Sequence, residues 1–324
     1  MQKYEYHYKK FNEFINNQNF NFEPHELYDP IAYTLALGGK RIRPVIALMA
    51  CHIFDGKYEN IINPAMGIEI FHNFTLLHDD IMDDAPIRRG KETVYRKWNP
   101  NIAILSGDTM FALAYKYITK TDPKYLPDIL EVFNKTAIDV CEGQQLDMNY
   151  EDQPQITIED YLNMIRLKTA VFIGASLKIG AIISDTTQEN IDNIYSFGEH
   201  LGMAFQLQDD LLDVFGDEEK FGKQIGGDII TNKKTFLYIR AFELATGESL
   251  ESLKQHFITN HPDHQLKVQQ IKKVYTDLKV NKYVQDEIFR YYNQSLIYLE
   301  KIQVDQESRN ELKMLADRLI KREY

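Results

Sequence analysis

The chain has 324 residues, of which 44% are hydrophobic and 26% are charged, and its formal net charge is −11. This acidic balance argues against a nucleic-acid partner, because a phosphate backbone is bound by a basic surface. The only two cysteines, Cys51 and Cys141, exclude a disulfide framework and zinc-ligand spacing, and we expect both to be buried reduced thiols.

The rest of the composition favours a helical protein. The 16 glycines and 10 prolines are few for this length, which favours long helices over a turn-rich β architecture. No segment approaches the roughly 18 consecutive apolar residues of a membrane span. Residues 1–10 lack the apolar core of a signal peptide. We therefore expect a cytoplasmic protein without a membrane span.

Helical periodicity dominates the chain. In the first half, helices are expected at residues 31–37, 45–54, 64–82, 102–119 and 126–148. In the second half, they are expected at residues 158–183, 191–214 and 233–245, with amphipathic helical spacing over residues 249–324. A basic loop at 38–44, a turn at 86–90 and a polar loop at 216–232 lie between them. No repeat or linker divides the sequence, so we predict an all-α fold in one domain, residues 1–324, built around a cavity.

One acidic pattern occurs twice, as Asp79-Asp80-Ile81-Met82-Asp83 and as Asp209-Asp210-Leu211-Leu212-Asp213. Positions i, i+1 and i+4 of a helix lie within an arc of about 100°, so the three carboxylates of each copy are expected to point the same way. Their mutual repulsion disfavours the helix. A single copy is more often a solvated acidic face, but both copies follow apolar helical stretches. Two such clusters would hold hard divalent cations, which favours chemistry on a phosphate-rich substrate.

Basic residues accompany both acidic motifs. If the metal-loaded clusters hold one diphosphate, a second anion needs direct contacts from lysine or arginine. The candidates are Lys40, Arg43, Arg88, Arg89, Lys168, Lys223 and Lys233. Most surface lysines and arginines are merely solvated. That interpretation is weakest for the pair at 88–89, which a proline turn and a glycine bracket.

A histidine lies within the apolar stretch before the first acidic motif. His72 precedes Asp79 by one to two helical turns. A lone histidine in an apolar segment is more often a core residue whose ring is hydrogen-bonded within the protein. Its alignment with the acidic motif makes it a candidate phosphate contact.

The motifs, taken together and in this order, resemble those of the trans-prenyltransferases, the polyprenyl diphosphate synthase family, over nearly the whole chain. The residues that carry the resemblance are the loop 38–44, His72, the acidic motif 79–83, the segment 88–90, Gly143, Gln144, Asp147, Lys168, Thr169, the segment 205–208 with the acidic motif 209–213, Lys223 and Lys233.

The resemblance implies an isoprenoid synthase fold, a helical bundle around a deep central cavity, usually in a homodimer. It implies a head-to-tail condensation of isopentenyl diphosphate with an allylic diphosphate (dimethylallyl, geranyl or farnesyl). It also implies three Mg²⁺ ions per active site, with ligands drawn from Asp79, Asp80, Asp83, Asp209, Asp210 and Asp213.

The same resemblance assigns the remaining residues. Arg88, Lys168 and Lys223 would complete the allylic diphosphate pocket, and Lys40, Arg43, His72 and Arg89 would bind isopentenyl diphosphate. The catalytic set would be Lys168, Thr169, Gln206 and Lys233. Ionisation of the allylic C–O bond creates a cation and a highly charged leaving group. Metal and basic side chains stabilise the leaving group, while neutral dipoles stabilise the cation without capturing it.

The residues before the first motif predict the product length. In related enzymes a bulky residue five positions before the motif forms the floor of the chain tunnel, and Phe74 holds that position, with Thr75 next and Phe71 one turn earlier. This pattern favours a short product, farnesyl to geranylgeranyl (C15 to C20), leaning to geranylgeranyl. The alternative is that Phe71 and Phe74 are ordinary core residues. The sequence leaves the exact length and the preferred primer open.

Three other functions are weighed against this one. A terpene cyclase shares the first acidic motif, but its second metal motif usually carries Asn, Ser or Glu ligands, and it does not need a basic loop for a second diphosphate. A non-catalytic subunit on this fold is expected to have lost some of the acidic or basic residues, and here all are present. An acidic helical interaction protein does not explain the ordered basic set.

Overall fold

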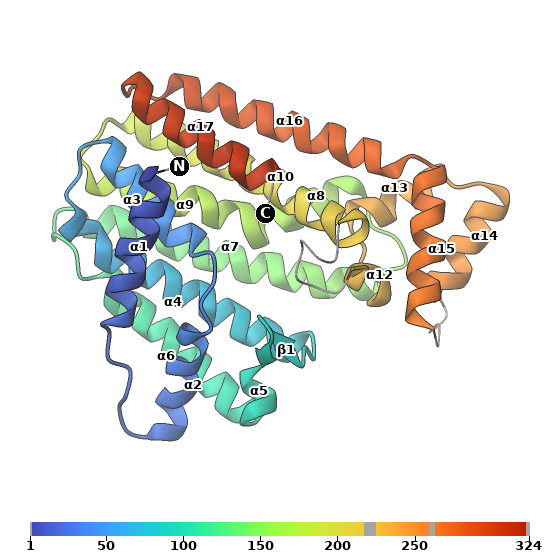
Figure 1. The fold of residues 1–324 in the computed structure, drawn as a ribbon, viewed down its shortest axis with the longest axis horizontal. Coiled ribbons are helices and arrows are strands. Elements are labelled where there is room, and N and C mark those ends of the chain that lie inside the picture. The colour runs from blue at the N-terminus through green and yellow to red at the C-terminus, as the bar shows by residue number, and fades with distance from the viewer. Residues whose placement is uncertain (1, 217–224, 259–262, 322–324) are drawn as a thin grey trace. The chain divides into compact units, whose positions relative to one another are not determined.

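The computed structural model describes residues 2–216, 225–258 and 263–321 of the chain. Most of this part is helical (Figure 1), which confirms the all-α class. The strands in this described part are β1 (Ile87–Arg88) and β2 (Lys91–Glu92), which form a short antiparallel ribbon where the sequence predicted a turn. None of the helices in this described part is long and apolar enough to cross a membrane.

The helices predicted in the first half of the chain are present, with ends shifted by a few residues. They are α2 (His25–Ala36), α3 (Ile42–Ile53), α4 (Tyr58–Met82), α6 (Pro100–Ile118) and α7 (Leu126–Asp152). Two more, α1 (Gln2–Asn16) and α5 (Val94–Lys97), were not predicted. Helix α1 reads as polar and aromatic, yet it buries Tyr4, His7, Phe11 and Ile15 at helical spacing.

The second half follows the prediction except at one break and at a short helix, residues 227–230, within the predicted polar loop 216–232. The predicted helix 158–183 is divided into α8 (Ile158–Ile165), the π-helical segment η1 (Arg166–Ala170) and α9 (Val171–Ile183). The remaining helices are α10 (Gln188–Phe215), α12 (Gly227–Ile230), α13 (Phe236–Leu244), α14 (Gly247–Ile258), α15 (His264–Asp277), α16 (Val280–Lys301) and α17 (Gln306–Lys321). A π-helical turn inside an α-helix frequently marks a functional site.

The chain forms two compact units. The first comprises the residues up to Asn134 together with Ser176–Asp192, and the second comprises Lys135–Ala175 together with the residues from Asn193 onward. The first acidic motif lies in the first unit and the second motif in the second. That the whole chain acts as one domain around a deep central cavity stays a prediction.

In the first unit, α4 is packed against α3 and α6 and is buried over most of its length. Gly67 permits the close approach to α6, because a Cβ atom there would lie 2.8 Å from the carbonyl oxygen of Ala114. The buried part of α4 extends to Asp80, the middle residue of the first acidic motif.

In the second unit, α10 contributes Met203, Leu207 and Leu211 to a core shared with α8, α13, α15 and α16. Gly202 brings α10 close to η1, since a Cβ atom there would lie 2.7 Å from Cα of Ala170. The second acidic motif is thus also held at the end of a buried helix.

The prediction for the cysteines is half wrong. Cys51 is buried, but Cys141 is exposed. Ile138, one turn before it on α7, is 59% exposed, so this side of α7 is not covered by the chain itself. An apolar helical context in the sequence did not reveal which side of α7 is covered.

Candidate active site

The first acidic motif occupies the end of α4, and its middle carboxylate points into the protein. Asp80 is buried, and the Nε and Nη2 atoms of Arg88 each lie 2.7 Å from its Oδ1. Burial raises the pKa of Asp80 to about 6, against the lowering effect of the Arg88 charge. Asp79 is half-buried and Asp83 exposed. The three carboxylates therefore do not share one environment, because a step of one residue turns Asp80 onto the covered side of the helix.

The second acidic motif repeats this arrangement on α10. Asp210 is buried, Gln206 Nε2 donates to its Oδ1 at 2.9 Å, and the Tyr161 hydroxyl donates to its Oδ2. Burial, followed by the nearby charge of Asp228, raises the pKa of Asp210. Asp209 is half-buried. In both motifs the middle carboxylate is anchored by neighbouring protein groups.

The third carboxylates differ between the two copies. Asp213 Oδ2 accepts a hydrogen bond from the backbone N–H of Asp228 at 3.0 Å, at the start of the short helix α12. Asp83 follows the last residue of α4, and its own backbone N–H donates to the Asp79 carbonyl at 2.8 Å. The second copy therefore organises the chain that follows it, whereas Asp83 presents its side chain outward.

The π-helical segment η1 carries two of the predicted catalytic residues. Lys168 Nζ lies 2.6 Å from Asp147 Oδ2, and Lys233 Nζ lies 3.8 Å from the same oxygen. Burial acts to raise the pKa of Asp147, but the charges of Lys233 and Lys168 outweigh it and the pKa is lowered. Gly143 makes room for the segment, because a Cβ atom there would lie 2.3 Å from the backbone nitrogen of Lys168.

A hydrogen-bonded chain links η1 to the second motif. The Thr169 hydroxyl donates to Gln206 Oε1 at 3.1 Å, and Gln206 in turn donates to Asp210. The structure thus brings together Lys168, Thr169, Gln206, Asp210 and Lys233 within the second unit. Lys223, the remaining predicted residue near this motif, lies outside the described residues.

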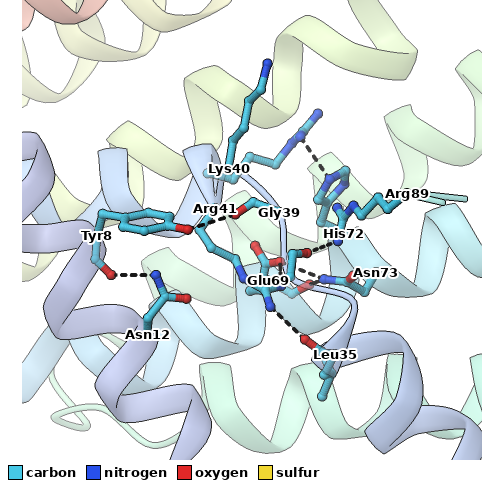
Figure 2. A network of polar contacts seen from close by, with 12 residues as sticks. Tyr8, Asn12, Leu35, Gly39, Lys40, Arg41, Glu69, His72, Asn73 and Arg89 are labelled. Carbon is cyan, nitrogen blue, oxygen red and sulfur yellow. Dashed lines mark hydrogen bonds and ion pairs between the residues drawn. The ribbon is translucent and has the colours of Figure 1, made fainter. Parts of the chain in front are cut away.

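In the first unit, the basic loop lies beside His72 (Figure 2). Arg43 Nη1 is 3.4 Å from His72 Nε2. Burial, followed by the charges of Arg43 and Arg89, holds the pKa of His72 well below its usual value, so the ring is neutral at pH 7. The Arg89 guanidinium donates to the carbonyl of Gly38. Gly39 allows this approach, because a Cβ atom there would lie 2.8 Å from the guanidinium.

A buried ion pair supports the loop from below. Arg41 donates to Glu69 and, at 2.6 Å, to the carbonyl of Leu35, and both charged side chains are almost fully buried. Asn73 donates to the same Glu69 oxygen at 2.7 Å. Figure 2 shows the Lys40 side chain extending away from this pair. Arg41 is therefore turned into the protein, whereas Lys40 points away from the buried ion pair.

The predicted chain-length residues belong to a cluster of aromatic rings. The ring centroids of Phe71 and Phe74 are 5.6 Å apart, and Phe74 is stacked on Phe111 of α6 at 5.2 Å. Phe133 of α7 closes the cluster, 5.3 Å from Phe71. The Thr75 hydroxyl donates to the His72 carbonyl at 2.8 Å, so it bonds within its own helix.

Comparison with known proteins identifies the family. A polyprenyl synthetase family model matches residues 24–278. The geranylgeranyl diphosphate synthase of Methanosarcina mazei is 38% identical over 222 residues, 68% of each chain. The geranylgeranyl pyrophosphate synthase of Geoglobus acetivorans is 36% identical over 318 residues, 98% of this chain and 96% of that one. The chain belongs to the polyprenyl synthetase family.

Solved structures agree with this family. The crystal structure of a geranylgeranyl pyrophosphate synthase matches with a TM-score of 0.94 and 40% identity, covering 98% of both chains. That of the geranylgeranyl pyrophosphate synthetase from Pyrococcus horikoshii matches with a TM-score of 0.87 and 33% identity, covering 99% of this chain and 97% of that chain. The isoprenoid synthase fold and the prediction of a short-chain prenyl diphosphate synthase are confirmed. As a polyprenyl synthetase, the protein is a prenyltransferase.

Polyprenyl synthetases generally depend on Mg²⁺. The donors here are carboxylate oxygens, which suit this ion. In the part of the chain that the structure describes, no three His, Cys, Asp or Glu side chains form a ready-made metal cluster. Mg²⁺ is commonly held by one or two carboxylates and the phosphates of its substrate, rather than by a cage of protein ligands. The half-buried Asp79 and Asp209 and the exposed Asp83 fit that mode.

Several residues that build this polyprenyl synthetase site were not singled out from the sequence. Tyr161 and Asp228 surround Asp210, Glu69 fixes Arg41, and Phe111 packs on Phe74. Tyr161 lies 49 positions from Asp210 in the chain. Asp228 offered the one usable signal, since it is an acidic residue in the glycine-rich segment after the second motif. The others are ordinary residues of apolar or charged helices.

Proposed function

We propose that this prenyltransferase joins isopentenyl diphosphate to an allylic diphosphate, head to tail, with geranylgeranyl diphosphate as its main product. One observation carries the proposal. Each acidic motif has its own organised basic set, with Arg88, Arg89 and the loop 38–44 in the first unit and Lys168 and Lys233 in the second. Within the first unit, Arg88 is bound at the acidic motif, whereas Arg89 and Arg43 lie at the loop 38–44 beside His72. This separate group of cations suits a second diphosphate besides the metal-bound one. Several relatives at 35–38% identity are named geranylgeranyl synthases, which supports the product.

The allylic diphosphate is assigned to the two acidic motifs. In this proposal, three Mg²⁺ ions per site have their ligands among Asp79, Asp80, Asp83, Asp209, Asp210 and Asp213. When bound, Mg²⁺ would neutralise charge on the departing diphosphate. Asp80 and Asp210 already accept hydrogen bonds, but each carboxylate has about four acceptor sites, so this does not prevent a further contact. Arg88, Lys168 and Lys223 complete the pocket.

The catalytic residues act on the charges that form when the C–O bond breaks. Thr169 and Gln206 form a neutral hydrogen-bonded pair, whose dipoles stabilise an allylic cation without capturing it. Lys168 and Lys233 share Asp147, which holds their ammonium groups in place. These two cations stabilise the diphosphate as it leaves.

The second substrate is assigned to the basic loop. Lys40, Arg43 and Arg89 supply positive charge for isopentenyl diphosphate, and the neutral His72 supplies a hydrogen bond. The His72 ring has a low pKa because it is buried among arginines, so it adds no further positive charge to the site. In this proposal the lysine and the two arginines supply the positive charge, and His72 supplies a directed hydrogen bond.

The product length is assigned to the aromatic cluster. Phe71 is fully buried and Phe74 half-buried, and both rings contact Phe111. We assign Phe74 as the floor of the growing chain, with Phe71 beneath it and Thr75 beside it. A threonine at that place leaves more room than a second aromatic ring, which supports geranylgeranyl over farnesyl length.

We further propose that the enzyme is a cytoplasmic homodimer. Ile104 and Leu105 on α6 are 46% and 58% exposed, and two adjacent apolar side chains on one helix suit a contact with a second copy. Sedimentation of the purified chain tests the dimer.

One assay tests the activity. The protein is incubated with Mg²⁺, labelled isopentenyl diphosphate and each allylic primer in turn, and the products are sized. We expect a C20 diphosphate, and its loss in an Asp79→Asn variant but not in an Asp286→Asn variant, whose side chain is exposed on α16. A hydrocarbon released from farnesyl diphosphate alone would instead identify a terpene cyclase. No turnover with any primer would indicate a non-catalytic subunit.

A further inference from the structure

Helix α1 contacts the basic loop through two tyrosine hydroxyls. The Tyr4 hydroxyl donates to the carbonyl of Lys40 at 3.0 Å, and the Tyr8 hydroxyl donates to the carbonyl of Gly39 at 3.3 Å. Figure 2 shows the Tyr8 ring reaching the loop at Gly39 while the Lys40 side chain extends elsewhere. Both hydroxyls therefore bond to the backbone of the loop.

The loop has a backbone that needs such support. The φ angles of Gly38, Gly39 and Arg41 are 73°, 135° and 48°, all in the left-handed region. For Arg41, which has a Cβ atom, this conformation is unfavourable and persists only where the surroundings fix it. The buried pair with Glu69 fixes Arg41 through its side chain. The two tyrosines fix the carbonyls of the two residues that precede it.

Helix α1 is itself a firm support. Phe11 is fully buried, and Tyr4 and Ile15 are less than 9% exposed. The rings of Tyr4 and Tyr8 are stacked, with their centroids 6.5 Å apart and an angle of 12° between them. Both hydroxyls are therefore presented to the loop from one fixed helical face.

We propose that Tyr4 and Tyr8 are positioning residues, which hold the loop 38–41 in the conformation that presents Lys40 and Arg43 to a diphosphate. The inference rests on the proposed function, because that function names isopentenyl diphosphate as the ligand of the loop. Neither tyrosine contacts the reacting atoms. They act through the backbone to which Lys40 and Arg43 belong.

The kinetic test removes the hydroxyls and keeps the rings. In Tyr4→Phe and Tyr8→Phe variants of the full chain, we expect KM for isopentenyl diphosphate to rise roughly fivefold per hydroxyl, the scale of one lost hydrogen bond. The double variant should show the larger rise, with kcat and KM for the allylic primer kept. Tyr6→Phe is the matched control, since Tyr6 lies on the same helix and is 56% exposed. A merely structural role would change the two KM values together and lower the melting temperature.

Hydrogen exchange tests the loop without substrates. The backbone amides of residues 38–41 should exchange faster in the double variant than in the wild type or in Tyr6→Phe. Unchanged exchange overturns the proposal, and so does an unchanged KM for isopentenyl diphosphate in an active double variant. If the wild type shows no condensation, the proposed function fails instead, and the exchange result alone decides whether the tyrosines hold the loop.

Discussion

The Arg88 guanidinium holds the buried carboxylate of Asp80, with two of its nitrogens each 2.7 Å from the same oxygen. The pKa of Asp80 is nevertheless raised to about 6, because burial outweighs the attraction of Arg88. The ionised carboxylate is therefore less favourable in the folded protein than in the unfolded chain. The first acidic motif keeps this charge at a cost to stability, as expected for a group retained for its function.

Replacement of Asp80 by asparagine should stabilise the metal-free protein and impair its activity. The carboxyl titrates near pH 4 when unfolded and near pH 6 when folded, so the wild type loses stability as the pH rises between these values. Above pH 6 the Asp80→Asn variant should exceed it by about 1–3 kcal/mol in the free energy of unfolding. At pH 4 the two should be nearly equal. Urea denaturation with a chelator present measures the free energy of unfolding of the two proteins at each pH.

Asp83→Asn is the control for this prediction. Asp83 is one helical turn away in the same motif but exposed, so its replacement should leave the free energy of unfolding within about 0.5 kcal/mol of the wild type. Lower stability of Asp80→Asn at pH 7 would show that the ion pair with Arg88 outweighs burial.

The sequence predicted the charged residues of the site but not the groups that hold them. Asp80 and Asp210 are recognisable as members of a repeated motif. Tyr161, which donates to Asp210, and Glu69, which pairs with Arg41, are 49 and 28 positions from their partners. Such contacts depend on which helices pack together. Neither local spacing nor a motif encodes that.

The helices were predicted where apolar periodicity is strong and missed where it is not. Helix α4 is apolar over most of its length and was recognised, although its start at Tyr58 was placed six residues too late. Helix α1 was missed because its buried stripe includes a histidine and a tyrosine. The π-helical break at Arg166–Ala170 leaves the apolar periodicity nearly intact and depends on the close contact with Gly143. It could not be predicted from periodicity.

Replacement of Phe74 by alanine should lengthen the product by at least one isoprene unit. Removal of the ring opens space above Phe71 and beside Phe111, which Phe74 contacts with centroid distances of 5.6 and 5.2 Å. The remaining rings limit the gain. Chromatographic sizing of the products from labelled isopentenyl diphosphate measures it. Phe289→Ala, at a site 63% exposed on α16, is the control. An unchanged product distribution in Phe74→Ala would reject Phe74 as the floor.

His7 should make the fold sensitive to acid. Burial, followed by the facing His52 and the nearby Lys3, lowers the pKa of His7 to about 4. The unfolded chain therefore binds a proton that the folded protein does not, and stability is lost as the pH falls from about 6.5 to about 4. The full loss is about 3 kcal/mol. It is measured as the slope of the free energy of unfolding against pH.

A His7→Phe variant should reduce this slope, because a phenyl ring fills the buried site and does not titrate. His264→Phe, at an exposed position, should keep the wild-type slope. Asp80 also titrates in this range, so the comparison is between the variants and the wild type. If His7→Phe and the wild type had the same slope, His7 would not be the sensor.

The two acidic motifs should respond unequally to the loss of a charge. Asp79→Asn removes a ligand proposed for the metal, and kcat should fall by about 10²–10³-fold, the scale of one lost electrostatic contact to a developing charge. Asp213→Asn should cost about tenfold or less, because its amide oxygen still accepts from the N–H of Asp228, as Asp213 Oδ2 does at 3.0 Å. Asp213→Ala loses this acceptor as well and should lower the free energy of unfolding by about 1 kcal/mol. Single-turnover rates at saturating Mg²⁺ compare the variants, and equal losses for Asp79→Asn and Asp213→Asn would show that the copies act as equivalent metal ligands.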